Sequence, residues 1–387
     1  MKVLHLVSNR KLTGPVDPAI RLARALYELN ADSRIAVGRE RPGHGPIDDL
    51  VRVRGLEPIT DLCLPKHRKL LVNRADVKCL CRRLEADPVD VIHAHLDNAH
   101  GVAVRARQAL ERALRLQPRS RRPLVVRSLY DDEAPRSSLR YRWLYARESD
   151  GVFVHGEEVR RVVIERFRLP EDRVVKLDGA VSSECFHPRE PGDDLREALG
   201  IPREAIVVGV VARIQRHRRF EFLLEAMRRV MEEVPEVVLL ILGRGTHARE
   251  IALDGAKKLG ISDRVVLPGY VGGEDYVKAL ACFDIKVFLV PGSDGTCRAV
   301  REAMATGIPV VASRRGLLPE IVRDGTDGLI TDEAPEPLYR AIRKLATEPA
   351  LRREMGQNAL RRAREDFSLR RQAELVLDAY RRWLDVR

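Results

Sequence analysis

Short apolar runs rich in valine and isoleucine recur along this chain, and each is followed by a loop and then by a segment of helical periodicity. The first run is Val3–Val7. Residues 8–15 then form a loop with a glycine and a proline, and Ala19–Leu29 carries apolar residues at helical spacing. The pattern recurs at residues 89–95, before a helix expected from about Val102, and a further run lies at 124–126. Apolar strands that alternate with helices are typical of a parallel sheet covered on both faces, so we expect an α/β fold.

The chain has 387 residues, more than one hydrophobic core normally supports, and this predicts two domains. Residues 174–188 show no periodicity, and Pro-Gly-Asp-Asp follows at 191–194, as in a linker. We expect a first domain over 1–185, a second over 186–368, and a helix over 369–387 that returns to the first domain. The strands expected in the second domain are 206–211, 237–242, 265–267, 285–289 and 309–312. The helices expected there are about 220–233, 247–259, 274–282, 297–306 and 317–323, followed by 335–346, 350–365 and 369–386.

Positive charge is concentrated in the first half of the chain. Residues 1–180 hold 35 Lys and Arg against 25 Asp and Glu, whereas the rest holds 34 against 32. Either the first half contacts an anionic partner, such as a membrane surface or an acidic glycan, or its arginines are only solvated; both interpretations stay open. Nucleic acid is disfavoured, because the basic stretches, such as 66–69 and 119–122, lack interleaved aromatic residues.

The beginning of the chain bears on its location. No apolar run reaches the roughly 20 residues that cross a bilayer, and Met1 leads directly into an apolar run without a signal-peptide pattern. We expect a cytoplasmic protein, with peripheral attachment to the inner face of the cell membrane as an option. The six cysteines are scattered, so reduced thiols are expected rather than disulfides or zinc ligands.

The most informative segment runs from Pro291 to Val311. A loop leaves a predicted strand and brings Asp294 and Gly295 to the beginning of a predicted helix, and Glu302 follows about two turns later. Free N–H groups and the positive end of the helix dipole suit a phosphate or pyrophosphate, while carboxylates can bind sugar hydroxyls. The structural alternative is an N-cap at Asp294 and an ordinary helix charge at Glu302.

This segment resembles the signature of retaining GT-B glycosyltransferases of family 4. In that family two acidic residues separated by seven others precede an Ala-x-Ala-x-Gly-x-Pro-Val-Val run, and Asp294 and Glu302 match this spacing. The resemblance implies two Rossmann-like parallel-sheet domains facing a central cleft. It assigns Asp294 to the donor sugar and Glu302 to the nucleotide ribose, although Asp294 stands for the usual Glu and Cys297 for a common Gly. The other donor-binding residues it implies here are Gly295, Thr296, Cys297 and Arg298.

Two arginines follow the first predicted strand of the second domain. Arg213 and Arg218 resemble the Arg and Lys of the family's Gly-Arg-Leu-x5-Lys-Gly segment, which hold the diphosphate. An arginine in place of lysine keeps the charge and offers a planar fork to phosphate oxygens. The family is thought to work without a protein nucleophile, so the resemblance implies that Arg213, Arg218 and Asp294 are the catalytic residues, with no cofactor and no metal.

Glycines in three turns are assigned to the donor site by the same resemblance. The sequence Gly243-Arg244-Gly245 nearly matches a dinucleotide-binding fingerprint, but it follows the second strand of its domain rather than the first, so we assign it to nucleotide contacts in the glycosyltransferase manner. Gly269 lies in the turn after the next strand. Gly14, in the first loop of the chain, corresponds to a glycine-rich loop near the donor phosphate and the acceptor.

His95 and Tyr130 are candidate acceptor-side residues. His93 and His95 would project to the same face of a strand, with Asp97 beyond, and could bind a metal. The family has this His-x-His run without a metal, and the chain has no Asp-x-Asp sequence, so no metal is expected. Tyr130 stands where many members have a histidine that faces the reacting sugar.

We therefore expect a retaining glycosyltransferase of hexosyltransferase type, which moves a sugar from a nucleotide-diphosphate sugar to a glycan or lipid-linked acceptor in surface polysaccharide or lipopolysaccharide synthesis. One alternative is a protein that binds a sugar nucleotide without turnover, suggested by Tyr130 and Asp294. Another is a different enzyme on a related fold, such as a sugar-nucleotide epimerase or a nicotinamide dehydrogenase.

Overall fold

The chain forms two compact units, each built around its own parallel sheet. The computed structural model describes residues 1–12, 14–114, 122–131, 133–190, 192–290 and 297–386. The first unit comprises Met1–Gly179 together with Leu369–Arg387, and the second comprises Ala180–Ser368. No described helix is both long enough and apolar enough to cross a membrane. The predicted α/β fold with two parallel-sheet domains is confirmed.

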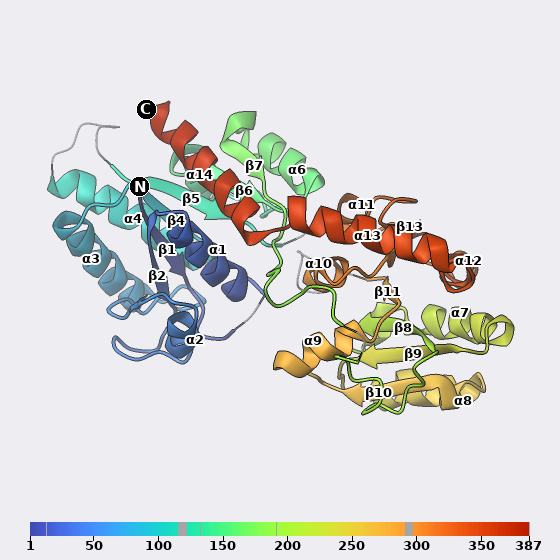
Figure 1. Ribbon diagram of the computed structural model, residues 1–387. Coiled ribbons are helices and arrows are strands. Elements are labelled where there is room, and N and C mark those ends of the chain that lie inside the picture. The colour runs from blue at the N-terminus through green and yellow to red at the C-terminus, as the bar shows by residue number, and fades with distance from the viewer. Residues whose placement is uncertain (13, 115–121, 132, 191, 291–296, 387) are drawn as a thin grey trace. The chain divides into compact units, whose positions relative to one another are not determined.

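The sheet of the first unit has seven parallel strands in the order β3-β2-β1-β4-β5-β6-β7 (Figure 1). Their bounds are β1 Lys2–Val7, β2 Asp32–Val37, β3 Pro58–Ile59, β4 Val91–Ala94, β5 Leu124–Ser128, β6 Gly151–Val154 and β7 Val174–Lys176. Alternate residues of β1 point to opposite faces, so Val3 and Val7 pack on one side while Leu4 and Leu6 pack on the other. The strands are buried on both faces, as the continuous apolar runs predict.

Helices cover both faces of this sheet. On one face lie α1 Val16–Glu28, α2 Asp48–Val53 and α14 Leu369–Asp385, and on the other lie α3 Leu70–Ala86, α4 Asp97–Ala113 and α6 Glu157–Phe167. The short helix α5 Leu139–Arg142 continues into a π-helical turn, Trp143–Arg147. The helix expected from about Val102 begins five residues earlier, at Asp97, and β7 lies inside the stretch 174–188, where the sequence showed no periodicity.

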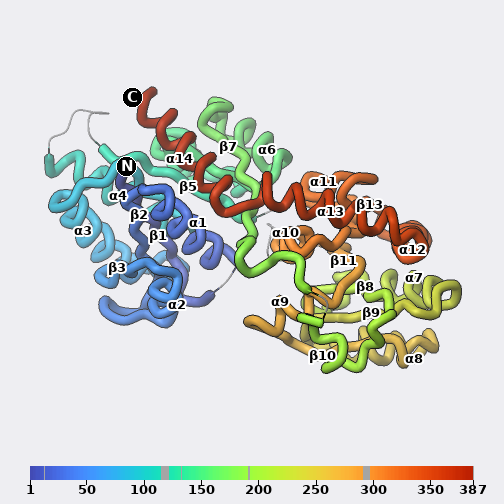
Figure 2. Tube along the Cα trace, in the orientation of Figure 1, coloured from blue at the N-terminus to red at the C-terminus, as the bar shows by residue number. Residues whose placement is uncertain are grey.

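The C-terminal helix α14 belongs to the first unit, and Figure 2 shows it beside α1. The Trp383 indole N–H donates to the carbonyl oxygen of Asp172 at 2.9 Å, and the Gln372 amide donates to that of Asp178 at 2.7 Å. Gly151 of β6 leaves room for this helix, because a Cβ there would lie 2.3 Å from the Trp383 ring. The last residues of the chain therefore complete a core that the first residues begin.

The sheet of the second unit has six parallel strands in the order β10-β9-β8-β11-β12-β13. Their bounds are β8 Ile206–Val211, β9 Val237–Leu242, β10 Val265–Gly269, β11 Ile285–Phe288, β12 Val310–Ser313 and β13 Gly328–Thr331. This order reverses direction between β8 and β11, as in dinucleotide-binding folds, and ligands bind such sheets outside the carboxyl ends of the strands. The sequence patterns predicted the first five of these strands closely and missed β13.

Helices cover both faces of the second sheet as well. One face is covered by α7 Phe220–Glu233, α8 Gly255–Lys258 and α12 Pro335–Thr347, and the other by α9 Gly273–Ala281, α10 Arg298–Ala305, α11 Leu318–Ile321 and α13 Pro349–Asp366. The helix expected over 247–259 is instead a π-helical segment, Arg249–Asp254, followed by the short α8. The first unit ends at Gly179, six residues before the expected boundary, because β7 and the turn after it complete its sheet.

Candidate active site

A cavity of about 460 Å³ lies at the carboxyl ends of β8 and β9 in the second unit. Its size is within the range of small-molecule sites. It brings together seven residues that the sequence assigned to the donor: Arg213, Arg218, Gly243, Arg244, Cys297, Arg298 and Glu302. These residues come from three separate loops and one helix. The cavity therefore assembles motifs that are up to 89 positions apart in the sequence.

Arg213 and Arg218 both lie in the segment between β8 and α7 and reach the same cavity. Neither guanidinium has a carboxylate within 4.0 Å among the described residues. Arg218 donates to the carbonyl oxygen of Val290 at 2.6 Å, which holds its side chain in place. Burial, and next the nearby charge of Arg213, lower the pKa of Arg218. Two neighbouring cations that repel each other form a site for an anion.

Glu302 lies in the second turn of α10 and is 7% exposed. The hydroxyl of Tyr276, from α9, donates to Oε2 of Glu302 at 2.6 Å, and Nε of Arg298 lies 3.4 Å from Oε1. Burial, and next the Glu302 carboxylate, raise the pKa of Tyr276 well above its usual value, so the hydroxyl stays a donor. The carboxylate is therefore held in one orientation at the wall of the cavity, as a hydroxyl-binding group requires.

Gly243 and Gly245 allow the turn after β9 to pass close to the segment after β8. A Cβ on Gly243 would lie 1.9 Å from the carbonyl oxygen of Ala212, and one on Gly245 would lie 2.0 Å from that of Ile214. The close approach lets the backbone hydrogen bonds of the sheet continue past the strand ends. These glycines thus shape the floor of the cavity through the backbone, and Gly243 but not Gly245 lines it.

Further residues on the cavity wall come from the turn after β10. Gly269, at φ +90°, lets the chain turn there but does not line the cavity. The ring of Tyr270 does line it, and the guanidinium carbon of Arg244 lies 4.7 Å from the centre of that ring. Tyr270 is 68% exposed, so the stacked pair presents a flat aromatic surface at the mouth of the cavity.

Asp294, Gly295 and Thr296 lie outside the described residues. Cys297, which follows them, precedes the first residue of α10 and adopts a left-handed backbone with φ +48°. Glycine adopts this conformation without strain, whereas other residues do so at a cost of about 1 kcal/mol. The left-handed backbone at Cys297 is thus one that a glycine would adopt more easily.

In the first unit, His95 and Tyr130 contact each other in the interior. His95 has no exposed surface and Tyr130 is 8% exposed, and the Tyr130 hydroxyl forms a 2.7 Å hydrogen bond with Nδ1 of His95. Gly14 lies in the turn before α1. The two candidate acceptor-side residues are therefore buried in the folded unit rather than placed on an open surface.

Three imidazoles meet in this interior and could in principle hold a metal. Potential ligand atoms of His5, His93 and His95 lie within 4.8 Å of one another. Five of the six ring nitrogens already have hydrogen-bond partners, which are each other, Ser128, Tyr130 and Tyr380 of α14. Burial lowers the pKa of each of the three imidazoles below 6.5. The donor set is thus engaged as a hydrogen-bonded network of neutral rings.

Residues 192–362 match the family described as glycosyl transferases group 1. The match lies within the second unit and includes the cavity. This region of the chain is therefore similar to the group 1 glycosyltransferase domain. The chain is accordingly a transferase. Its two parallel-sheet α/β units are consistent with this activity.

Relatives of this glycosyltransferase include the D-inositol 3-phosphate glycosyltransferase of Kribbella flavida, which is 29% identical over 311 residues, or 76% of this chain and 71% of that protein. With three of the curated relatives the aligned part spans 56 to 71% of their own length. Anabaena HepE in complex with UDP has a TM-score of 0.78 at 18% identity, covering 99% of this chain and 100% of that one. A Listeria monocytogenes structure described as a putative UDP-N-acetylglucosamine 2-epimerase has a TM-score of 0.65 at 14% identity, covering 100% and 97%. These structures show that the glycosyltransferase has the GT-B fold.

Sequence reasoning missed two residues of the glycosyltransferase cavity, Tyr270 and Tyr276. Tyr270 directly follows the assigned Gly269, and Tyr276 lies on α9, which carries no motif. Tyr270 could have been found from the sequence, because it is an aromatic residue directly after a turn glycine. Only the packing of α9 against α10 identifies the second, because Tyr276 and Glu302 are 26 positions apart.

Proposed function

We propose that this protein is a retaining glycosyltransferase of family 4 that uses a nucleotide-diphosphate sugar. The observation that carries the proposal is the combination of groups in the second-unit cavity. Arg213 and Arg218 offer positive charge with no carboxylate partner among the described residues, while Glu302 offers a buried, oriented carboxylate. Such a cavity suits a nucleoside diphosphate. Its diphosphate would contact the two arginines, and its ribose hydroxyls would contact the carboxylate.

In the proposed reaction the bond between the sugar C1 and the diphosphate oxygen breaks, and the acceptor oxygen bonds to C1 on the same face. The electron pair of the broken bond goes to the diphosphate, whose charge Arg213 and Arg218 stabilise where it develops. The proton of the acceptor hydroxyl moves to an oxygen of the leaving phosphate. Neither a protein nucleophile nor a general base is required, and Asp294 is proposed to hold the donor sugar.

The structural relatives support a nucleotide-sugar donor. HepE has been solved with UDP and also with UDP-glucose, and the structure with UDP-glucose has a TM-score of 0.72 to this chain. We accordingly propose Glu302 as the ribose acceptor. Its two oxygens face Tyr276 and Arg298, so a bound ribose would share an already ordered carboxylate.

The experiment that tests this proposal measures release of nucleoside diphosphate from a panel of sugar nucleotides. Arg213→Ala should lower kcat by roughly 100- to 1,000-fold, as for removal of one strong transition-state donor, with the fold retained because Arg213 is exposed. The matched control is Arg216→Ala in the same segment. Arg216 is 70% exposed, pairs with Glu250 and does not line the cavity, so turnover should stay within twofold or so of wild type. Near-native turnover of Arg213→Ala would contradict the proposal.

The same assay separates the alternatives. A GT-B fold also occurs in a structure described as a putative 2-epimerase, so fold does not decide between the two chemistries. Release of nucleoside diphosphate with transfer to an acceptor supports a transferase. Interconversion of two sugar nucleotides supports an epimerase, and tight binding without turnover supports a non-catalytic protein.

We further propose that the acceptor is a glycan or lipid-linked molecule in surface polysaccharide or lipopolysaccharide synthesis. Peripheral attachment of a cytoplasmic protein to an anionic membrane fits the excess of Lys and Arg in residues 1–180. Of the two basic stretches that motivated this idea, residues 66–69 are described, and 119–121 lie outside the described residues. Vesicle binding that weakens as salt rises would support the attachment.

A further inference from the structure

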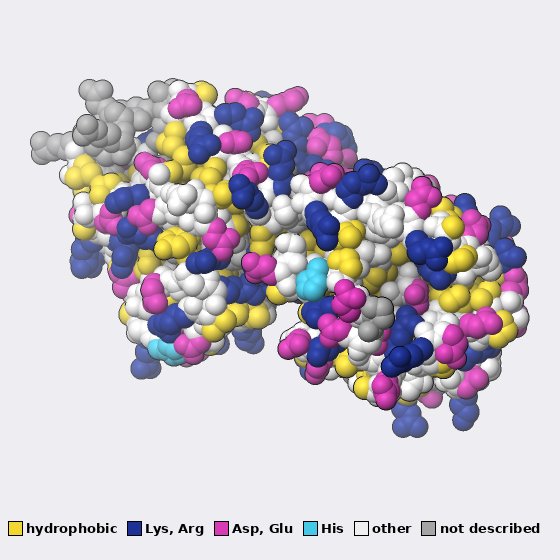
Figure 3. All heavy atoms as spheres, in the orientation of Figure 1, with side chains coloured by type: hydrophobic (Ala, Val, Ile, Leu, Met, Phe, Trp, Pro, Cys, Tyr) yellow, Lys and Arg dark blue, Asp and Glu magenta, His cyan; other side chains and the backbone are white. Residues whose placement is uncertain are grey.

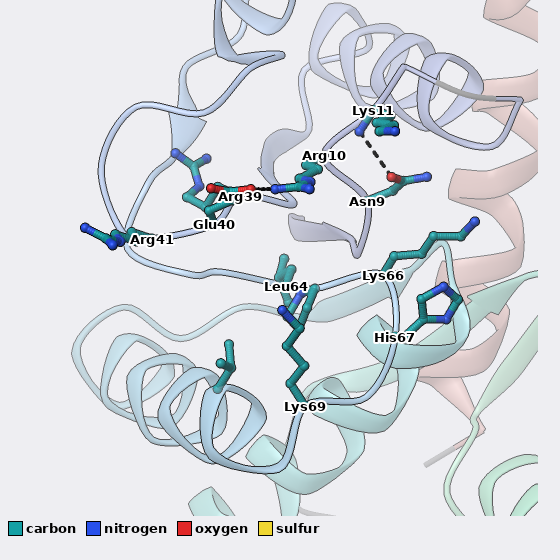
Figure 4. A pocket seen from close by; sticks show the side chains of 12 residues that line it. Asn9, Arg10, Lys11, Arg39, Glu40, Arg41, Leu64, Lys66, His67 and Lys69 are labelled. Carbon is teal, nitrogen blue, oxygen red and sulfur yellow. Dashed lines mark hydrogen bonds and ion pairs between the residues drawn. The ribbon is translucent and has the colours of Figure 1, made fainter.

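The first unit contains a second cavity, of about 580 Å³, at the carboxyl ends of β1 and β2 (Figure 4). Three loops enclose it. They are residues 9–11 after β1, 39–41 after β2, and 64–69 before α3, and Val72 in the first turn of α3 completes the wall. No residue of this cavity was assigned to the donor. Its position follows the rule that parallel sheets bind ligands outside the carboxyl ends of their strands.

The wall of this cavity is strongly cationic. It carries six Lys or Arg side chains and a single carboxylate, that of Glu40. The six basic residues are Arg10, Lys11, Arg39, Arg41, Lys66 and Lys69. On the face of the molecule drawn in Figure 3, by contrast, Lys and Arg side chains are interspersed with Asp and Glu. On the surface elsewhere some arginines pair with neighbouring carboxylates, as Arg161 does with Glu158 at 2.7 Å.

Two of the six cations are neutralised within the fold. Arg39 and Asp48 form a 2.9 Å ion pair in which neither side chain is exposed, and Asp48 also accepts from the N–H of Gly45. Arg39 further donates to the carbonyl oxygen of Ile59 at 2.9 Å, which ties the loop after β2 to β3. Arg10 pairs with Glu40 across the two loops, as the dashed line in Figure 4 marks. The buried Arg39–Asp48 pair fixes the loop after β2 in place, and the Arg10–Glu40 pair links this loop to the one after β1.

Four cations then remain without a carboxylate within 4.0 Å among the described residues: Lys11, Arg41, Lys66 and Lys69. They come from all three loops, and each is exposed. In Figure 4, Lys69 extends from the beginning of α3 toward Leu64, on the side of the cavity that faces Arg10 and Glu40. The positive end of the 17-residue helix α3 adds to their field.

This charge pattern favours a phosphate over a carboxylate. A carboxylate carries one negative charge and suits a single planar guanidinium, whereas three of the four unpaired cations are lysines, which act as point charges. A phosphate monoester carries up to two charges and three oxygens that can be shared among several ammonium groups. The cavity is also large enough to hold a sugar-sized group attached to that phosphate.

We propose that this cavity binds a phosphate group carried by the acceptor substrate. That the phosphate belongs to an acceptor rests on the proposed transferase function. The binding of phosphate itself does not depend on turnover. Arg68 provides a comparison within the chain. It lies in the same basic stretch as Lys66 and Lys69 and is exposed, yet it does not line the cavity.

The test is a calorimetric titration of the full chain with inorganic phosphate at pH 7.5, with ionic strength held constant by chloride. Phosphate should bind wild type and Arg68→Gln equally, and the double variant Lys66→Gln/Lys69→Gln should bind at least about tenfold more weakly, as expected for the loss of charge-assisted hydrogen bonds. Arg213→Ala should retain this binding, because its cavity belongs to the other unit. Absence of phosphate binding in wild type would overturn the proposal, as would equal weakening in Arg68→Gln.

Two further measurements identify the source of the phosphate and separate this proposal from the function proposed above. Sedimentation with phosphatidylglycerol vesicles that inorganic phosphate reverses indicates a lipid-borne phosphate, whereas faster turnover with a hexose 6-phosphate than with the hexose indicates a soluble one. Turnover with the hexose 6-phosphate that Lys66→Gln/Lys69→Gln leaves unchanged would overturn the acceptor assignment. Nucleoside diphosphate release without acceptor reports the donor site alone, so its loss would count against the transferase and not against the phosphate cavity.

Discussion

The second unit contains a fully buried lysine, although lysines rarely lie in protein interiors. Lys286 of β11 has no exposed surface, and its Nζ has no hydrogen-bond partner among the described residues. The rings of Phe283 and Phe288 lie 5.4 and 5.8 Å from Nζ. Burial lowers the pKa of Lys286 to about 7, and the charge of Glu302 opposes this shift only in part. The ammonium is thus held at a cost to stability.

Replacement of this lysine by methionine should stabilise the protein in a pH-dependent way. The folded pKa of about 7 lies below the unfolded value of 10.5, so wild type loses stability as pH falls from 10.5 to 7 and carries a constant cost below pH 7. Lys286→Met should therefore raise the free energy of unfolding at pH 6 by on the order of 3–5 kcal/mol, and by little near pH 10. Urea unfolding at both pH values measures this. Lys257→Met, at an exposed position, is the control and should change the free energy little at either pH.

At the scale of elements, the donor cavity depends on how closely two loops pass each other. Backbone carbonyls of Ala212 and Ile214 occupy the space where side chains of Gly243 and Gly245 would begin. Both glycines were expected, from the sequence, to contact the nucleotide. The structure adds a reason that concerns the protein itself, because without these glycines the segment carrying Arg213 would be displaced.

Gly243→Ala should therefore destabilise the second unit by about 1–3 kcal/mol, the usual cost of overpacking, and should weaken nucleotide binding as well. Gly101→Ala is the matched control, because Gly101 lies within α4 and its Cβ would meet only an Arg140 side chain at an ordinary 3.5 Å. Alanine in a helix interior should stabilise by about 0.5–1 kcal/mol. Thermal unfolding with and without UDP measures both effects. Unchanged UDP binding in Gly243→Ala would contradict the prediction that the close approach of the loops after β8 and β9 is needed for nucleotide binding.

At the scale of the whole molecule, the two units differ in their response to acid. The first unit buries His5, His93, His95 and His100 as neutral rings, because burial lowers the pKa of each, to about 3 for His5 and His100. Tyr380 of α14 bonds to Nδ1 of His93 at 2.6 Å, so the C-terminal helix closes this network. Protonation would place positive charge in an interior where, among the described residues, no carboxylate lies within 4.0 Å of these rings, and only His100 is near one, that of Asp97.

The first unit should consequently unfold as pH falls, and it should do so before the second. Its folded histidine pKa values lie below the unfolded value of 6.5, so stability is complete above pH 6.5 and is lost below it, by up to about 1.4 kcal/mol per pH unit for each histidine. Both tryptophans, Trp143 and Trp383, belong to this unit, so tryptophan fluorescence reports on it alone. The midpoint should lie between about pH 6 and 4, and UDP should not shift it. A midpoint below pH 3 would contradict the prediction that protonation of the buried histidines destabilises the first unit.

Local periodicity was sufficient for much of the fold, because a strand or an amphipathic helix reveals its buried face within a few residues. Residues 206–211 and 220–233 were predicted with the bounds that β8 and α7 have. In the first unit β2, β3, β6 and β7 were not predicted. These strands are short or carry polar residues, and they are stabilised mainly by neighbouring strands that lie elsewhere in the sequence.

The sequence by itself pointed to several residues of the second-unit cavity, since charge and glycine spacing are properties of short segments. Arg213, Arg218, Gly243 and Glu302 were all identified from such segments, and the structure brings them to one cavity. Only the tertiary structure decided the contact between Tyr276 and Glu302, the burial of His95 and Tyr130, and the second cavity with its four unpaired cations. The physical reason is that pairing and burial depend on distances between segments far apart in the chain. Arg41 is next to Glu40 in sequence, yet Glu40 pairs with Arg10 instead. The loops 39–41 and 64–69 are likewise separate in sequence but share one cavity.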